Sequence, residues 1–176
     1  ASCLVGSEMC IRDSARDEAQ AIRQTAGLID ASAFTKHRVS GPGATAFLDW
    51  FTTNKLPKVG RINLTYALTP AGTTRTEYTI VRLDQDDYYL ISAGAWTDYD
   101  ADYLRKTAED KQADFGQVII QDITTQWGVF ALAGPNSRKI LNEIVRDADP
   151  ATVLGNKRFP WLSMRNIEPV SYTHLR

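Results

Sequence analysis

Glu77 is the strongest candidate in this sequence for acid–base chemistry. It opens a β-branched and aromatic segment that follows the turn-like stretch TPAGTTRT. If that segment is a strand, Glu77 shares one face with Val81 and Leu83. Apolar surroundings disfavour the charged form of a carboxylate unless it is paired. The residues alone leave two interpretations open: a reactive carboxylate, or a strand-end Glu paired with an Arg or Lys across the sheet.

The common catalytic and metal-binding motifs are absent. The sequence has no G-x-G-x-x-G segment after a strand, no Walker loop, no G-x-S-x-G elbow and no H-E-x-x-H motif. His37 has no carboxylates at ligand spacing, so we expect no metal site and an exposed strand position for this residue. The LDQDD segment lacks the glycine and distal glutamate of a calcium loop, which indicates a solvated hairpin turn. Trp96 and Trp127 could stack on a flat ligand, but we expect both in the core.

The two ends of the chain are related through the genetic code. Residues 8–14, EMCIRDS, can be encoded by a DNA whose reverse complement encodes VSYTHL, residues 170–175. This DNA resembles the inverted adapter that a transposase adds to sequencing fragments. We therefore expect residues 1–14 and 170–176 to be adapter-derived and not native, and residues 15–169 to be a native partial domain. Both cysteines of the chain lie in the first segment, so no disulfide or cysteine nucleophile is expected in the native part.

Charge and hydropathy limit the class of partner. The chain has 20 Lys and Arg against 21 Asp and Glu, and its formal net charge is −1. Nucleic-acid binding needs clustered Lys and Arg, so we expect no nucleic-acid partner. No apolar run approaches the roughly 20 residues of a membrane span, so we expect no membrane partner either.

Periodicity predicts the elements that hold Glu77. Helices are predicted at residues 15–25, 44–51, 97–110 and 134–145, and strands at residues 33–40, 63–68, 76–83, 88–93, 117–123 and 127–133. The segments VSGPGATAFLDWF and LAGPNSRKILNEI share the order strand, Gly-Pro, amphipathic helix. This repetition is compatible with a ferredoxin-like duplication, or with a common type of junction. Hairpins mixed with crossover helices predict an α+β fold with mainly antiparallel sheets and flanking helices.

Several segments, taken in order, resemble a known family. They are GLIDASAFTKHRVSGPGATAFLDWFTTNKLPKVGRI, AGTTRTEYTIVRL, YYLISAGAWTDYDADYL and WGVFALAGPNSRKIL. Together they resemble the aminomethyltransferase fold of the glycine cleavage T-protein, and more closely the C-terminal, folate-binding half of dimethylglycine and sarcosine dehydrogenases. The resemblance covers nearly all of residues 15–169. It implies a truncated T-protein-like folate-binding fold with a ferredoxin-like element.

The resemblance implies transfer of a one-carbon unit to tetrahydrofolate. In such dehydrogenases an upstream FAD domain oxidises a small-molecule substrate, an N-methylated glycine derivative, to an iminium. The folate-binding half then receives the one-carbon unit, whereas in the T-protein the donor is an aminomethyl group on a lipoyl arm. A carboxylate near the attacking folate nitrogen can hydrogen-bond that amine, accept its proton and stabilise a passing iminium.

Carried over residue by residue, this acid falls on Glu77. The T-protein pattern has a Gly-Gly pair and then two aspartates; here it reads Gly-Thr and then Thr and Glu, so the functional acid is one methylene longer. Phe34 falls on an apolar pocket position. Leu64 falls where the T-protein carries a pocket tyrosine, and Tyr66 follows two residues later. We predict that Glu77 is catalytic and that Phe34, Leu64 and Tyr66 bind the folate.

The predicted function is that of a fragment of an FAD-dependent dimethylglycine or sarcosine dehydrogenase-like oxidoreductase, the part that transfers a one-carbon unit to tetrahydrofolate. The FAD domain and the segment that grips the pterin are expected outside residues 15–169, so we expect the isolated fragment to be inactive. Two alternatives stay open: a stand-alone glycine cleavage aminomethyltransferase, and a non-catalytic folate-binding module of the same fold, which usually lacks the acid. We expect a cytoplasmic location for a prokaryotic source and the mitochondrial matrix for a eukaryotic one.

Overall fold

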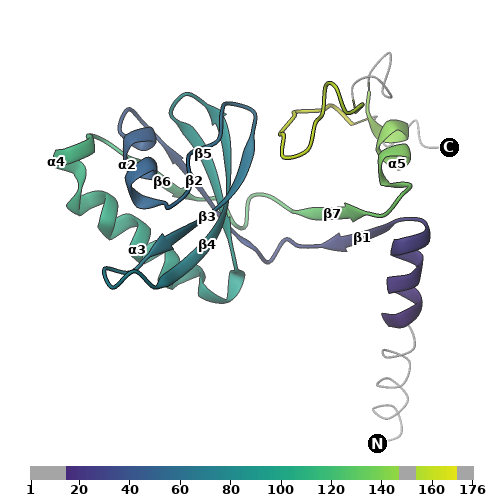
Figure 1. Ribbon diagram of the computed structural model, residues 1–176, viewed down its shortest axis with the longest axis horizontal. Helices are drawn as coiled ribbons and strands as arrows, with labels where there is room; N and C mark the ends of the chain where they lie inside the picture. The colour runs from purple at the N-terminus through teal and green to yellow at the C-terminus, as the bar shows by residue number, and fades with distance from the viewer. Residues whose placement is uncertain (1–14, 147–153, 170–176) are drawn as a thin grey trace, which may run out of the picture. The chain divides into compact units, whose positions relative to one another are not determined.

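The computed structural model describes residues 15–146 and 154–169, which fall into two compact units (Figure 1). The described part of the larger unit is residues 31–129 and 159–166, and that of the smaller unit is residues 15–30, 130–146, 154–158 and 167–169. The two segments expected to be adapter-derived, 1–14 and 170–176, lie outside the described residues. No helix in the described part is both long and apolar enough to cross a bilayer.

The larger unit is built on a five-stranded sheet with the order β3-β4-β5-β2-β6, in which every neighbouring pair is antiparallel. Its strands are β2 (Thr35–Ser40), β3 (Ile62–Leu68), β4 (Thr74–Asp84), β5 (Asp87–Ser92) and β6 (Ile119–Asp122). Its helices are α2 (Ala44–Phe51), α3 (Thr97–Asp110) and α4 (Gln112–Phe115), with a 3-10 turn at Gly94–Trp96. The α+β class with antiparallel sheets and flanking helices is therefore confirmed.

The core of the larger unit lies between the sheet and helices α2 and α3 (Figure 1). The apolar stripe of α2 includes Phe47 and Leu48, which are fully buried. Leu104 of α3 is buried in the same cluster, together with Tyr78 and Ile80 of β4. Because side chains alternate along a strand, burial of these two β4 residues leaves the side chains between them on the opposite face of the sheet.

His37 is buried and not exposed as predicted: 1% of its surface is accessible. Its strand, β2, lies between β5 and β6, and the alternation places His37 on the same side as the buried Val39. Neither ring nitrogen has a hydrogen-bond partner among the described residues. Burial lowers the pKa of His37, and the nearby charge of Asp122 only partly opposes this effect.

The smaller unit contains a helix at residues 15–24, a two-stranded antiparallel sheet and helix α5 (Ser137–Ile144). The strands are β1 (Gly27–Asp30) and β7 (Phe130–Ala133). Strand β1 was not predicted, because its four residues are too short a segment to show a period. The two strand–Gly-Pro–helix segments both form, as β2–α2 and β7–α5, and their strands belong to different sheets.

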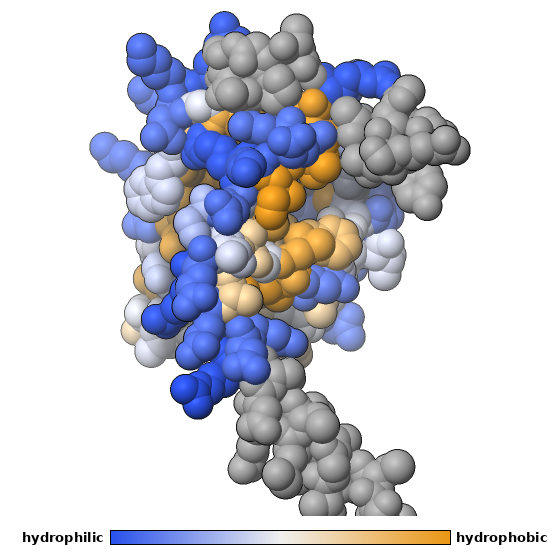
Figure 2. Space-filling model, turned by 90° about the vertical axis from the view of Figure 1, so that its right-hand side faces the viewer, coloured by the Kyte–Doolittle hydropathy of each residue, from blue (hydrophilic) through white to orange (hydrophobic). Residues whose placement is uncertain are grey.

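An apolar groove marks the surface of the smaller unit. It is lined by Ala26, Gly27, Leu28, Phe130, Leu132, Ile140, Leu141 and Ile144. Leu28 and Phe130 are 66% and 64% exposed. Figure 2 looks onto the molecule from this side and shows apolar side chains gathered at the surface.

Candidate functional site

A cavity of about 240 Å³ lies where strand β5 ends beside β4. The pairing of β4 with β5 reaches only to Thr79 and Ile91, whereas β4 begins five residues earlier, at Thr74. The first residues of β4 therefore have no β5 partner, and the cavity lies beside them. Its lining comprises Phe34, Arg75, Thr76, Glu77, Thr79, Ile91, Ser92, Ala93, Trp96 and Asp100.

The structure brings the four predicted site residues to one region of the larger unit. Glu77 and Phe34 both line the cavity. Tyr66 lies directly opposite Glu77 on β3, and Leu64 lies opposite the cavity residue Thr79. Leu64 and Tyr66 therefore adjoin the cavity without lining it. The catalytic and folate-binding roles of the four stay predictions.

Glu77 is solvent-exposed, and its cross-strand neighbour is a tyrosine, not the Arg or Lys of the structural alternative. A hydrogen bond to the Glu77 carboxylate, and secondarily its negative charge, raise the pKa of Tyr66. None of the ion pairs found in the described residues includes Glu77. The carboxylate thus lies beside a neutral tyrosine and remains accessible to a ligand.

Two aromatic side chains form the rim of the cavity. Trp96 is 63% exposed, which contradicts its predicted place in the core, and Phe34 is 47% exposed. Trp127, also expected in the core, is exposed as well. The sequence contains no apolar period around Trp96, and this missing period was the available sign that it does not face a core.

The two loops that carry these rim residues are held close together. A side chain at Gly94 would overlap the carbonyl oxygen of Ala33, so the loops could not approach this closely with any other residue. The hydroxyl oxygens of Thr35 and Thr97 lie 2.5 Å apart, which ties the start of β2 to the start of α3. Phe34 and Trp96 are the immediate neighbours of these two threonines, so the contacts fix the rim.

The inner wall of the cavity is polar. Asp100 of α3 is 2% exposed and accepts a hydrogen bond of 2.6 Å from the Thr76 hydroxyl. Ser92 is 3% exposed, and its Oγ has no partner among the described residues. Sequence reasoning missed both, because Asp100 is one of several acids on an exposed-looking helix and a lone serine at a strand end carries no signal.

The chemistry open to this site is that of carboxylates, hydroxyls and one guanidinium beside an aromatic rim. The described residues contain no group of three or more His, Cys, Asp or Glu side chains that could hold a metal ion. The arrangement can accept N–H donors from a ligand through Glu77 and can contact a flat ring through Trp96 and Phe34.

Comparison with known proteins assigns the fold to a family. Residues 7–176 match the GCVT N-terminal domain. The chain belongs to this family. The chain is similar to mitochondrial dimethylglycine dehydrogenase of Mus musculus, with 30% identity over 161 residues, 90% of this chain and 18% of the relative. The chain is also similar to the aminomethyltransferase of Listeria monocytogenes, with 28% identity over 138 residues, 77% of this chain and 36% of the relative.

Solved structures support the same assignment. Aminomethyltransferase T of the glycine cleavage system from Bartonella henselae superposes with a TM-score of 0.65 at 25% identity, covering 72% of this chain and 34% of that one. Heterotetrameric sarcosine oxidase from Corynebacterium sp. U-96 superposes with a TM-score of 0.53 at 18% identity, over 79% of this chain and 65% of that one, which shows a shared fold. The predicted family and the T-protein-like fold are both confirmed.

Proposed function

We propose that this GCVT N-terminal domain transfers a one-carbon unit to tetrahydrofolate, as the folate-binding part of an FAD-dependent dimethylglycine or sarcosine dehydrogenase-like protein. The chain spans only 18% of the mouse dehydrogenase and 36% of the listerial aminomethyltransferase, so substrate and partners are part of the proposal. The observation that carries it is the cavity in which Glu77 lies beside an aromatic rim. The FAD needed for dehydrogenation would be held by another part of the longer protein.

Tetrahydrofolate is a substrate in this proposal, and the cavity fits one end of it. Sites that enclose a drug-sized ligand measure about 300–1,000 Å³. The cavity here, of about 240 Å³, is large enough for a ring system but not for a whole folate. A flat ring can lie against Trp96 and Phe34, while the remainder of the folate extends along the sheet face that carries Leu64.

In the proposed reaction Glu77 handles the proton of the attacking nitrogen. The folate nitrogen forms a bond to the iminium carbon and gives its proton to the Glu77 carboxylate. The amine takes up that proton and leaves as its bond to the carbon breaks. The second folate nitrogen then forms a bond to the same carbon and releases its proton to water, which completes methylenetetrahydrofolate beside the demethylated amine. Tyr66, which lies opposite Glu77 on β3, is the neighbour whose hydroxyl can donate to the carboxylate.

A stand-alone aminomethyltransferase is the second candidate. The match to the listerial aminomethyltransferase covers 77% of this chain at 28% identity, close to the values for the mouse dehydrogenase. The two candidates share the tetrahydrofolate site and differ in the one-carbon donor. A eukaryotic source would place the protein in mitochondria, as the name of the mouse relative does for that protein.

The test is a calorimetric titration of the chain with tetrahydrofolate. We expect weak binding, and we expect Trp96→Ala to weaken it by about tenfold through loss of aromatic contact. Trp161→Ala is the matched control, because Trp161 is 84% exposed and does not line the cavity. Equal effects of the two substitutions, or no effect of either, would place the folate elsewhere.

A further inference from the structure

Arg75 occupies a β-bulge at the start of β4. Ala67 of β3 pairs with Thr76, and the next β3 residue, Leu68, pairs with Thr74. Arg75 is therefore an extra residue that has no pairing partner on β3. A bulge of this kind bends the strand locally and changes the direction of a side chain. Strict alternation would place Arg75 on the same face as Glu77. The bulge instead brings its guanidinium against helix α3, at the border of the cavity.

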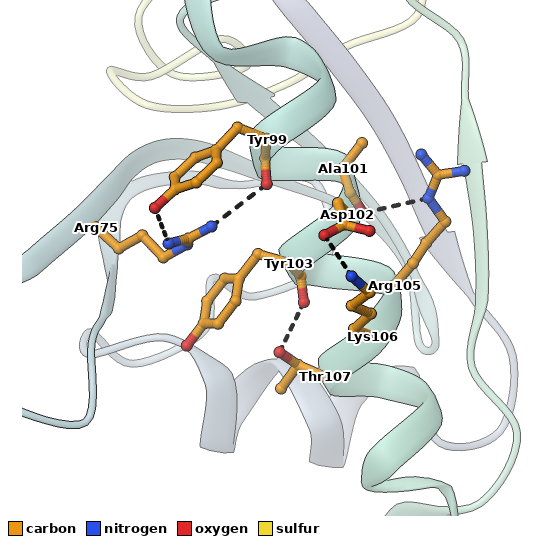
Figure 3. Close-up of polar contacts among 8 residues, drawn as sticks. All are labelled: Arg75, Tyr99, Ala101, Asp102, Tyr103, Arg105, Lys106 and Thr107. Carbon is orange, nitrogen blue, oxygen red and sulfur yellow. Dashed lines mark hydrogen bonds and ion pairs between the residues drawn. The ribbon is translucent and has the colours of Figure 1, made fainter.

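Two tyrosines of α3 hold this guanidinium (Figure 3). The carbon Cζ of Arg75 lies 3.7 Å from the ring centre of Tyr99 and 4.1 Å from that of Tyr103. Arg75 also donates hydrogen bonds to the hydroxyl and, at 3.4 Å, to the backbone carbonyl of Tyr99. A cation fixed in this way has already lost most of its side-chain freedom, so binding a ligand costs it little further entropy.

No carboxylate of the described residues neutralises Arg75. None of the ion pairs found there includes it, and its buried Nε has no hydrogen-bond partner. Asp100 also lines the cavity, but its carboxylate accepts the Thr76 hydroxyl and is not within ion-pair distance of the guanidinium. A guanidinium carries five N–H donors; in Arg75 two of them go to Tyr99 and Nε is buried, which leaves one N–H on each terminal nitrogen for a ligand carboxylate. Such a group at a cavity wall selects an anionic ligand.

We propose that Arg75 binds the carboxylate of an amino-acid ligand whose amine faces Glu77. This assignment rests on the proposed function and names its one-carbon donor as a glycine derivative. Arg75 and Glu77 both line the cavity, and their backbone positions on β4 are about 7 Å apart at 3.3 Å per residue. In an α-amino acid, nitrogen and carboxylate are attached to one carbon, so a ligand of this class is small enough for the cavity and carries a group for each of the two side chains. An aminomethyl group on a lipoyl arm has no carboxylate and would leave Arg75 unused.

The experiment is an NMR titration of the chain with sarcosine, run without folate. We expect Arg75→Gln to raise the Kd for sarcosine at least tenfold, and Arg75→Lys, which keeps the charge but loses the fork, to raise it less. Dimethylamine, which lacks the carboxylate, should bind equally to all three proteins. Arg82→Gln is the matched control: Arg82 is on the same strand and lies 5.2 Å from the ring centre of Tyr88, but does not line the cavity.

If Arg75→Gln does not fold, Tyr99→Phe replaces it, since that change keeps the ring and removes one hydrogen bond to the guanidinium. The assignment is overturned if wild-type chain does not bind sarcosine, or if Arg75→Gln binds it unchanged. It is also overturned if Arg75→Gln weakens the binding of tetrahydrofolate but not that of a tetrahydropterin without the glutamyl tail. In that case the carboxylate that binds Arg75 belongs to the folate. If the wild-type chain binds sarcosine as expected but does not bind tetrahydrofolate, the proposed function is refuted and the assignment of Arg75 stands.

Discussion

Replacing Glu77 by Gln separates a catalytic carboxylate from a structural one. Gln keeps the size and one acceptor oxygen, so the hydrogen bond from Tyr66 can persist. Glu77 is exposed and has no ion-pair partner among the described residues, so the melting temperature should hardly change. Removing a general base costs roughly 10²–10⁴-fold in rate. Because water reaches Glu77 and can replace it in part as a base, we expect a loss near the lower end, about 10²-fold.

The assay follows the fate of the one-carbon unit in the longer dehydrogenase proposed above. Flavin reduction by the methylated amine does not involve Glu77 and should proceed at the wild-type rate. Formaldehyde released to solvent should rise as methylenetetrahydrofolate formation falls. The ratio of the two products therefore reports on Glu77 independently of substrate oxidation.

A second measurement checks that the substitution has removed the charge from the right place. Because Glu77 raises the pKa of Tyr66, the variant should show one tyrosine that ionises at lower pH in an ultraviolet difference titration. Tyr66→Phe is the matched control, since it keeps the ring and the carboxylate and should lower the transfer rate far less. Wild-type formation of methylenetetrahydrofolate by the Glu77→Gln variant would refute the catalytic role and leave Glu77 a structural strand residue.

Three further predictions concern the scaffold. His37 is buried with a lowered pKa, so the imidazole binds a proton more readily in the unfolded chain than in the folded one. The free energy of unfolding should therefore be full above pH about 6.5 and fall on acidification by up to about 1.4 kcal/mol per pH unit. Denaturant titrations at several pH values should show this slope for the wild type and not for His37→Gln. Phe47→Ala should lower the free energy of unfolding by about 3–5 kcal/mol, measured by urea denaturation, because Phe47 is fully buried and stacks on Phe51 at 5.2 Å. Gly94→Ala should displace the loop at Ala33 and weaken tetrahydrofolate binding in calorimetry. Gly60→Ala adds backbone strain at a positive-φ turn that does not line the cavity, and it should leave that binding unchanged.

Much of the larger unit could be predicted from periodicity. Helix α2 has the predicted bounds because its apolar residues recur at helical spacing. The β4–β5 hairpin was predicted because β-branched and aromatic segments flank a short acidic turn. Burial of His37 could not be predicted in this way, because it depends on β2 being an inner strand with α3 packed above it. That position is a property of the sheet order, which no local pattern contains.

The candidate site could also be predicted only in part. The resemblance to the family pointed to Glu77 and Phe34, and the structure places both at one cavity. Arg75 and Trp96 were missed as site residues because their positions come from a bulge and from a close loop contact. Neither feature has a period in the sequence, and an arginine at a strand start most often indicates a solvated edge.

The short length of β5 and the bulge in β4 together produce the chemistry proposed here. If β5 were as long as β4, its backbone would pair with residues 75–77 and fill the cavity beside Glu77. If β4 had no bulge, Arg75 would project from the same face as Glu77, where the guanidinium could pair with the Glu77 carboxylate without a ligand. The short β5 leaves the cavity open, and the bulge places the guanidinium of Arg75 at the border of the cavity, against the tyrosine rings of α3. A carboxylate and a guanidinium on one strand can therefore face a ligand separately, which is what binding the amine and the carboxylate of one small molecule requires.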